Sequence, residues 1–370
     1  MFERYLKEQT QNDLEKKMVF IGGPRQVGKT TFALGLIENK KGYLNWDVPK
    51  DREKILKQEL PDLNFLILDE IHKFKNWRNF LKGLFDKGYE NKKYLIAGSA
   101  KLDYYRYSGD SLQGRYHYLR MFPLSFKELK MQNTADLLSL IELGGFPEPF
   151  FASSKIDSKR WSREYRTRLI NEELNKLENI KDLSNLELLS IRLPELVGSP
   201  LSINSITTDI PVSNKTLANW INILERLYSI FRISPFGAPK IRAVKKEQKH
   251  YHFDWTLIKE NGLRFENLVA VTLLKWVCFM QDSLGEEYEL RYFRDIDGRE
   301  VDFVILHDFK PIMFIETKWN DNEISKGLKY LKERFKDVKA FQVSAIGKKD
   351  YVSKQDIRVC PANIFLNEFI

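Results

Sequence analysis

We predict an α/β fold for this chain, with a doubly wound, mostly parallel sheet over residues 1–150. Three observations favour it. Short apolar runs alternate with helical stretches through this part of the chain. A glycine-rich loop at residues 23–30 joins the first apolar run to a helical stretch. Two strands with alternating polar and apolar residues follow much later, at residues 298–305 and 312–318, and predict a second, separate sheet.

The first strand and the loop after it carry the strongest signal. Residues 18–21 predict a buried strand, and residues 31–38 predict a helix. The loop between them reads Gly-Pro-Arg-Gln-Val-Gly-Lys-Thr and matches the phosphate-binding pattern G-x-x-x-x-G-K-[ST]. Its two glycines let successive backbone N–H groups point at one anion, the lysine reaches the β- and γ-phosphates, and the last threonine ligates Mg²⁺. The bland alternative is an ordinary strand–turn–helix. We expect ATP to bind at Gly23, Pro24, Arg25, Gln26, Val27, Gly28, Lys29, Thr30 and Thr31.

An apolar run at residues 64–68 ends in two carboxylates, Asp69 and Glu70. An unbroken apolar run is typical of a central strand that is covered on both faces. At its carboxyl end Asp69 would hold Mg²⁺ through water, and Glu70 would orient and deprotonate the attacking water. The alternative is a strand end followed by an acidic helix cap. Two adjacent acids favour hydrolysis over transfer of the phosphoryl group to a substrate.

Three more strands are predicted at residues 43–46, 94–97 and 116–121. Ser99 follows the second of them. The position resembles that of a polar residue in additional-strand ATPases that touches the γ-phosphate or the lytic water, which makes Ser99 a candidate sensor, although a plain strand-end serine fits as well. Arg115 precedes the third. It could complete the site of a neighbouring copy by stabilising charge on the transferring phosphoryl group, or it could pair with a local acid.

Composition narrows the class of protein. The 370 residues have a net charge of +9, which favours a polyanionic partner. The hydrophobic share of 43% is that of a globular chain. Cys278 and Cys360 exclude a disulfide scaffold, and the five histidines show no metal-binding spacing. The start of the chain has no signal peptide, and the longest apolar stretch, residues 268–280, contains Lys275 and is too short to span a bilayer. We expect a soluble cytoplasmic protein with no membrane partner.

The middle of the chain predicts a helix-turn-helix, with helices starting near residue 201 and over residues 217–227. Strands at residues 230–233 and 251–253 bracket the basic segment 240–249 in the manner of a wing. In the functional interpretation Lys215 and Asn219 face a DNA groove and the wing contacts phosphates. The alternative is a spacer or a protein-docking surface. A second basic segment, residues 159–168, strengthens the expectation of a nucleic-acid partner, with DNA favoured.

The late hairpin predicts a second chemistry. Glu316 and Lys318 lie on one face of their strand because side chains alternate, and the hairpin would place Asp302 beside them. Asp302 and Glu316 could hold Mg²⁺ while Lys318 stabilises a pentavalent phosphate. The pattern resembles the PD-(D/E)xK nuclease motif, and Glu266 on the preceding helix matches the additional acid often found there. The alternative is an ion pair between Glu316 and Lys318 beside an incidental Asp302.

Taken in order, six motifs resemble a large family of prokaryotic AAA-type ATPases. They lie at residues 23–31, 68–73, 98–99, 112–116, 123–126 and 144–148. The resemblance implies a P-loop AAA-type domain, a winged helix-turn-helix and a restriction-endonuclease-like α/β domain. The bounds that we expect are 1–150 for the ATPase domain, 151–185 for a helical linker, 186–260 for the winged helix and 261–370 for the nuclease-like domain.

The resemblance also implies roles for particular residues. Arg115 would be the arginine finger, and Arg163 or Arg166 could serve as a second sensor. The expected function is ATP hydrolysis by a protein that acts on DNA, with nucleotide state gating a Mg²⁺-dependent nuclease-like domain. The alternatives are a regulatory switch whose last domains bind protein or nucleic acid without cleavage, and a motor that needs a closed ring. A homo-oligomer is therefore possible.

Overall fold

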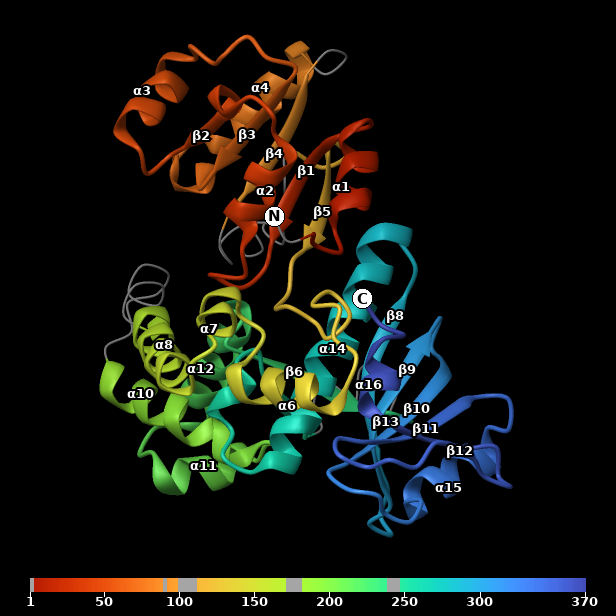
Figure 1. Ribbon diagram of the computed structural model, residues 1–370. Coiled ribbons are helices and arrows are strands. Elements are labelled where there is room, and N and C mark those ends of the chain that lie inside the picture. Colours follow the sequence, from red (N-terminus) through yellow and green to blue (C-terminus); the bar gives the residue numbers. More distant parts are fainter. Residues whose placement is uncertain (1–2, 89–91, 99–111, 171–181, 238–246) are drawn as a thin grey trace. The chain divides into compact units, whose positions relative to one another are not determined.

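The computed structural model describes residues 3–88, 92–98, 112–170, 182–237 and 247–370. The chain forms two compact units (Figure 1). The first comprises Met1–Phe122 with Asp282–Leu284, and the second comprises Pro123–Gln281 with Gly285–Ile370.

The first unit is built on a five-stranded sheet in the order β2-β3-β4-β1-β5, with every pair parallel. This arrangement confirms the predicted parallel sheet. The fourth strand in sequence lies between β1 and β3 and so separates the strand of the glycine-rich loop from the strand of the two acids. The strands are β1 (Met18–Gly22), β2 (Tyr43–Asn45), β3 (Phe65–Asp69), β4 (Lys93–Ala97) and β5 (Tyr116–Arg120).

Helices separate the strands from β1 to β4, as parallel pairing requires. The core between them includes Phe20 and Leu68 from the strands and Trp77 and Leu81 from a helix, all of them buried. All five residues of β1 are buried, which explains why its sequence is continuously apolar. The helices are α1 (Lys7–Leu14), α2 (Lys29–Leu36), α3 (Pro49–Lys57) and α4 (Trp77–Gly88), with the 3₁₀ turns η1 (Lys40–Gly42) and η2 (Ile71–Lys73).

The second unit contains an eight-stranded sheet in the order β12-β13-β11-β10-β9-β8-β6-β7. The predicted late hairpin is present, because β9 pairs antiparallel with β10 and places Phe303 opposite Ile315. The strands are β6 (Ile230–Pro235), β7 (Lys249–His252), β8 (Tyr288–Arg294), β9 (Glu300–His307), β10 (Lys310–Lys318), β11 (Lys339–Ser344), β12 (Tyr351–Val352) and β13 (Arg358–Pro361).

The helices of the second unit include the two that the sequence predicts as a helix-turn-helix. Ser213 caps the second of these, accepting a hydrogen bond from the Thr216 amide at 3.1 Å. Its apolar face is buried as expected, from Leu217 through Trp220 to Leu224. The described helices are α6 (Thr134–Leu143), α7 (Pro147–Ala152), α8 (Lys155–Arg168), α10 (Leu183–Arg192), α11 (Ile203–Asp209), α12 (Asn214–Arg226), α14 (Asn261–Leu284), α15 (Lys326–Arg334) and α16 (Ala362–Leu366), with the 3₁₀ turns η4 (Leu193–Leu196) and η5 (Trp255–Leu257).

The hairpin of β6 and β7 belongs to the same sheet as the late strands. It pairs antiparallel within itself, with Phe231 opposite Tyr251. The end of β6 then pairs parallel with β8, with Ser234 opposite Arg291. The sequence predicts these strands as parts of two separate domains, because nothing in either segment signals a pairing across more than fifty residues.

Residues 123–150 pack within the second unit. The Trp255 indole donates a hydrogen bond to the Leu140 carbonyl at 3.1 Å, and the Lys275 ammonium contacts the Glu128 carboxylate. The expected bound of the ATPase domain at residue 150 therefore differs from the division by contacts at residue 122. Domain bounds within the second unit stay predictions.

Helix α14 includes the apolar stretch that the sequence predicts as a core helix, and most of that stretch is buried. None of the described helices combines the length and apolar character that crossing a bilayer requires. Cys278 and Cys360 are both free and buried.

Candidate nucleotide site and carboxylate cluster

The loop after β1 has the backbone that the phosphate-binding pattern requires. Gly23 has a φ of 120°, and a Cβ atom there would lie 2.2 Å from the Met121 carbonyl oxygen. Gly28 has a φ of 92° and caps the start of α2. Both positions demand glycine because side chains with a Cβ rarely adopt this region. The loop thus delivers backbone N–H groups to the amino end of a helix, where anions bind favourably.

Lys29 and Thr30 begin α2 and meet the acidic end of β3. The Lys29 ammonium is buried and donates to the carbonyls of Gly23 and Pro24, so it already lies within the loop. The Thr30 hydroxyl donates to Asp69 Oδ2 at 2.8 Å. The contact between Thr30 and Asp69 joins residues that are 39 positions apart, because the carboxyl ends of parallel strands meet at one edge of the sheet.

The donors at this edge suit Mg²⁺. The Thr30 hydroxyl and the Asp69 carboxylate present oxygen atoms side by side. Mg²⁺ prefers oxygen ligands and usually takes few of them from the protein, the rest being water and phosphate. Thr30 and Asp69 are therefore the residues that would hold a magnesium ion at this edge of the sheet.

Tyr43 and Asn45 on β2 extend this site, although the sequence patterns pointed to neither. The Tyr43 hydroxyl donates to Asp69 Oδ2 at 2.9 Å, and the Asn45 amide donates to that hydroxyl at 3.1 Å. Burial raises the pKa of Asp69, while the hydrogen bonds from Thr30 and Tyr43 oppose the rise. The neighbouring strand in the sheet is the signal that could have identified them, since β2 pairs with β3 and places Asn45 opposite Asp69.

Arg4 supports the loop from outside it and is likewise absent from the predicted site. Its guanidinium is buried and donates to the carbonyls of Val27 and Phe122, the first at 2.6 Å. A charged, planar side chain of this kind can hold two carbonyls in place at once. An arginine four residues from the start of a chain carries no pattern that predicts such a contact.

Glu70 stands at the end of β3 with a φ of 56°. Its carboxylate Oε2 lies 3.0 Å from the Lys73 ammonium and 3.6 Å from His72 Nε2. The same ammonium contacts Asp47 Oδ2 at 2.5 Å. In this arrangement the predicted base is held by a lysine, so it would have to exchange that partner for a water molecule to activate it.

The other two predicted residues of this unit have different outcomes. Ser99 lies outside the described residues. Arg115 forms a two-point ion pair with Asp86, with Nε 2.8 Å from Oδ1 and Nη2 3.3 Å from Oδ2. Pairing with a local acid is the alternative that the sequence left open. A role in a neighbouring copy stays a prediction.

In the second unit, the predicted nuclease-like residues come close together. The Lys318 ammonium lies 2.6 Å from Glu316 Oε1. Asp302 Oδ2 accepts hydrogen bonds from the Thr317 amide and hydroxyl at 2.8 and 2.7 Å, which fixes it against the same strand. Burial, and then the charge of Asp302, raise the pKa of Glu316 to about 8.

Glu266 joins this group from α14. Its Oε1 accepts a hydrogen bond from the Tyr251 hydroxyl at 2.8 Å and lies 3.6 Å from the Lys249 ammonium. Burial, and then the nearby Asp302, raise the pKa of Glu266 to about 7. The fourth predicted residue therefore lies near Asp302.

Lys249 corrects one sequence expectation. The sequence groups it with a basic wing that contacts phosphates, but its side chain is 1% exposed. Its ammonium contacts Glu300 and lies 4.0 Å from Asp302 Oδ1. It cannot reach a DNA backbone from there. The remaining residues of that basic segment, 240–246, lie outside the described residues. Over the described ranges, no group of three or more His, Cys, Asp or Glu side chains is placed to hold a metal ion.

Two surfaces bear on nucleic-acid binding. Helix α12 exposes Lys215 and Asn219, in keeping with the predicted groove-facing positions. Helix α8 exposes Lys159, Arg160 and Arg163 along its length.

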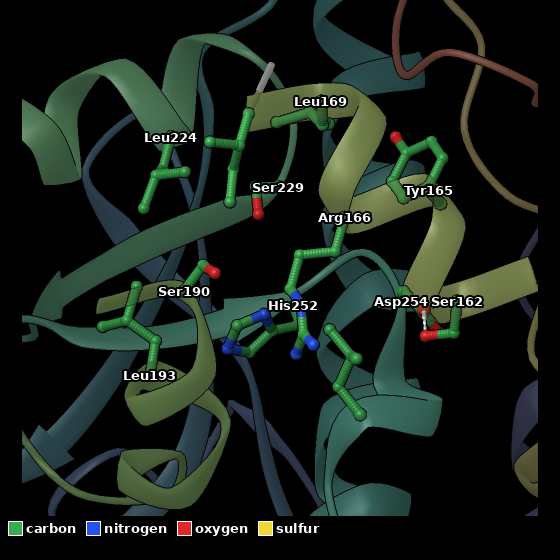
Figure 2. A pocket seen from close by; sticks show the side chains of 12 residues that line it. Ser162, Tyr165, Arg166, Leu169, Ser190, Leu193, Leu224, Ser229, His252 and Asp254 are labelled. Atoms are coloured by element: carbon green, nitrogen blue, oxygen red, sulfur yellow. Dashed lines mark hydrogen bonds between the residues drawn. The ribbon is translucent and has the colours of Figure 1, made fainter. Parts of the chain in front are cut away.

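Arg166 instead lines a pocket with Ser162, His252 and Asp254 (Figure 2). Ser162 donates a hydrogen bond to Asp254 there, and Figure 2 shows the Arg166 side chain extending toward His252. The pocket belongs to the second unit, and no residue of the glycine-rich loop lines it. The second-sensor role of Arg163 or Arg166 stays a prediction.

Comparisons with known proteins agree with the fold of the first unit. Residues 15–130 match a family described as an AAA domain. Residues 134–261 and 261–365 match two domains of unknown function, DUF8612 and DUF4143. The fold of the first unit is thus that of the AAA-type ATPases, as the sequence predicts.

Two relatives align over most of the chain. The uncharacterized protein MJ1544 of Methanocaldococcus jannaschii is 24% identical over 90% of this chain and 81% of its own length. An uncharacterized protein of Haemophilus influenzae is 22% identical over 91% of this chain and 92% of its own. Among solved structures, the Aeropyrum pernix ORC1 protein in complex with DNA has a TM-score of 0.34 and 13% identity, covering 72% of this chain and 93% of that one.

Proposed function

We propose that this chain binds ATP with Mg²⁺ at residues 23–31 and hydrolyses it. One observation carries the proposal: Lys29 lies inside a loop shaped by two positive-φ glycines, and Thr30 contacts Asp69 beside it. The AAA-domain match over residues 15–130 supports the same conclusion.

Each residue of the proposed site has a role that follows from its position. The backbone N–H groups of the loop and the Lys29 ammonium bind the phosphate oxygens, replacing the carbonyls that the ammonium now contacts. Bound Mg²⁺ would supply positive charge next to the β- and γ-phosphates. Thr30 and Asp69 are the residues that would hold it. Glu70 accepts the proton of the attacking water once it has released Lys73.

Lys29→Ala tests this proposal in the full chain. We expect the variant to lose the heat of ATP binding in calorimetry and to lose phosphate release. The control Lys16→Ala removes an exposed lysine just before β1 and should behave as the unmodified chain. Glu70→Gln should keep binding and lose hydrolysis. Undiminished ATP binding by Lys29→Ala would contradict the proposal.

A second candidate function is Mg²⁺-dependent nucleic-acid cleavage by the second unit, gated by nucleotide state. The convergence of Glu266, Asp302, Glu316 and Lys318 supports it. A regulatory switch that binds DNA or protein without cleavage is favoured instead by Lys249, whose ammonium lies among these carboxylates.

Asp302→Ala and Lys318→Ala separate these candidates. If the cluster cleaves DNA, both variants should lose Mg²⁺-dependent cleavage of a mixed DNA substrate and keep ATP hydrolysis. Lys29→Ala tests gating, because cleavage should then no longer respond to ATP. Cleavage that both variants retain would exclude a nuclease role for this cluster, and the absence of cleavage in the unmodified chain would favour the switch.

DNA binding rests on the exposed cations of α8 and α12. Neutralising Lys159, Arg160 and Arg163 to glutamine should weaken binding and flatten its dependence on salt, by roughly one power of the salt concentration for each phosphate that is no longer neutralised. The matched control neutralises three exposed lysines elsewhere, Lys348, Lys349 and Lys354. No DNA affinity at low salt would end the DNA interpretation.

A further inference from the structure

Four elements of the second unit bring charged side chains to one place. Glu300 and Asp302 are two residues apart on β9 and so share a face of the sheet. Glu266 comes from α14 and Glu316 from β10. Lys249 is the first residue of β7, the strand at one edge of the sheet, and β8 and β6 lie between β7 and β9.

The Lys249 ammonium is the point on which three carboxylates converge. It contacts Glu300 Oε1, lies 3.6 Å from Glu266 Oε1, and lies 4.0 Å from Asp302 Oδ1. Glu300 also faces the Arg294 guanidinium, at 3.8 Å. The ring of Tyr292 lies 5.5 Å from the same ammonium, so an aromatic face covers it as well.

The backbone fixes Lys249 in this position. The backbone of Lys249 pairs with Ile233 on β6 and also forms a β-bridge with Pro200. Its side chain is 1% exposed, and a lone ammonium so deeply buried would be strongly unfavourable. The carboxylates therefore stabilise the lysine, and the lysine in turn offsets the repulsion among them.

An oxygen atom in the same cluster still lacks a partner. Glu316 is 5% exposed, and its Oε2 atom is buried without a hydrogen bond, although Oε1 accepts one from Lys318. Buried carboxylate oxygens normally have a donor or a cation. The cluster thus has more acidic oxygens than its two lysines satisfy.

We propose that Lys249 is an internal cation that occupies the place of a divalent metal in this carboxylate cluster, and that its removal turns the cluster into a divalent-cation site. Glu266, Glu300 and Asp302 would be the ligands, since hard divalent cations take carboxylate oxygens. With the lysine among them these carboxylates are not placed to hold a metal ion, so they would have to close on the position that the ammonium leaves. In the conformation seen here, β7 keeps that site closed.

The inference concerns the cluster of the second candidate function, but it does not depend on cleavage. If the cluster does cleave nucleic acid with a metal, Lys249 must first leave it. That would make the position of β7 a control on the chemistry. Metal binding is the measured quantity, so a failure of this inference and a failure of the nuclease proposal can be told apart.

Manganese binding tests it in the full chain without nucleotide. All samples carry Asp69→Asn, which removes the carboxylate that would hold a metal ion at the nucleotide site. The free Mn²⁺ signal in electron paramagnetic resonance gives the bound fraction. We expect the Asp69→Asn chain to bind no Mn²⁺ and the same chain with Lys249→Met to bind one equivalent. Adding Asp302→Asn to the Lys249→Met chain should abolish that binding.

Each outcome bears on the proposal. The proposal would be overturned if the Asp69→Asn chain bound Mn²⁺ with Lys249 in place and the added Asp302→Asn substitution abolished that binding. Lys249 would then not close the site. A folded Lys249→Met chain that binds no Mn²⁺ would overturn it too. Another outcome is that circular dichroism shows the Lys249→Met chain to be unfolded. The proposal would then be supported if Mn²⁺ restored the fold of that chain and did not restore it once Asp302→Asn was added. No recovery would count against it.

Discussion

Tyr43 is the residue that most directly adds to the nucleotide site. Its hydroxyl takes one of the positions around Asp69 Oδ2, and Thr30 takes another. Two hydroxyl groups, one on a short and one on a long side chain, thus orient one carboxylate, which would supply an oxygen ligand to a metal ion. We therefore expect Tyr43 to act by positioning Asp69.

Tyr43→Phe should therefore raise the Mg²⁺ concentration needed for half-maximal ATP hydrolysis. One hydrogen bond to a charged group contributes about 1.5 kcal/mol, or roughly a tenfold change. The rate at saturating Mg²⁺ should change little. A Mg²⁺ titration at fixed ATP measures both, with Tyr351→Phe on an exposed tyrosine as the control. An unchanged Mg²⁺ requirement would show that Thr30 alone orients Asp69.

Lys275 and Glu128 form a second residue-scale feature, a buried ion pair. The side chains are 1% and 5% exposed, and the ammonium also donates to the Pro123 carbonyl at 3.1 Å. Glu128 accepts a further hydrogen bond from the Ser125 amide at 3.1 Å. The pair joins α14 to the segment that follows β5.

Lys275→Met should destabilise the second unit by about 3–5 kcal/mol, because it leaves a buried carboxylate without its cation. Urea unfolding followed by tryptophan fluorescence measures this. The double variant Lys275→Met with Glu128→Gln should recover much of the loss, since the glutamine is neutral and still accepts from Ser125. A double variant no more stable than the single one would contradict a charge-based cause.

At the scale of elements, β7 carries three buried polar side chains with different roles. Lys249 enters the carboxylate cluster, whereas His250 contacts the Leu193 carbonyl at 2.9 Å. Both ring nitrogens of His252 are buried without a hydrogen bond. Burial lowers the pKa of His250 to about 4, and burial together with His250 lowers the pKa of His252 well below its usual value.

These shifts predict a pH dependence of stability. A histidine whose pKa is depressed by folding binds fewer protons in the folded chain, so its contribution is complete above about pH 6.5. It is lost as the pH falls from there toward the folded pKa. Between pH 7 and pH 5 the protonation of His250 should lower the free energy of unfolding by roughly 2 kcal/mol, and His252 should act in the same direction.

His252→Phe should make that decline shallower, because phenylalanine does not titrate and has no nitrogen to satisfy. Urea midpoints at pH 7 and pH 5 measure the difference. The variant His117→Phe, on β5 of the other unit, is the matched control. Equal slopes for the unmodified chain and His252→Phe would mean that other groups set the acid sensitivity.

At the scale of the whole molecule, the predicted role of Arg115 in ATP hydrolysis depends on whether copies of the chain assemble. In a single chain it is paired with Asp86, and it can serve a phosphate only after that pair opens. A neighbouring copy would have to provide the competing charge. Arg115 can therefore act in trans only if the chain assembles in the presence of ATP, and the two predictions are tested together.

Arg115→Ala should keep ATP binding and lose most of the hydrolysis, as expected when a finger arginine is removed. Mixing it with Lys29→Ala should restore part of the activity, since one partner supplies the nucleotide site and the other supplies the arginine. Phosphate release from the mixture and the mass of the chain with ATP measure the two requirements. A monomeric mass together with full activity of Arg115→Ala would contradict it.

The arrangement of the candidate nucleotide site was largely predictable from local patterns. The strand at residues 18–21, the loop at 23–30 and the acids at 69 and 70 are each short, and each obeys a spacing set by backbone geometry. Parallel strands then bring the carboxyl ends together whatever the loops contain. The same reasoning identified Glu316 and Lys318, which lie two residues apart on one face of a strand. It also placed Asp302 beside them through a hairpin.

Contacts between distant segments could not be read in this way. Lys249 looks like one more cation in a basic run, and charged runs are usually solvated; its burial depends on β6 pairing with β8. The partners of Tyr43, Glu70 and Arg115 are likewise matters of which side chains the packed units bring within a few ångströms. Sequence patterns carry the rules of strand, helix and turn, whereas the charge balance of a buried site depends on packing between elements, and no local spacing records that packing.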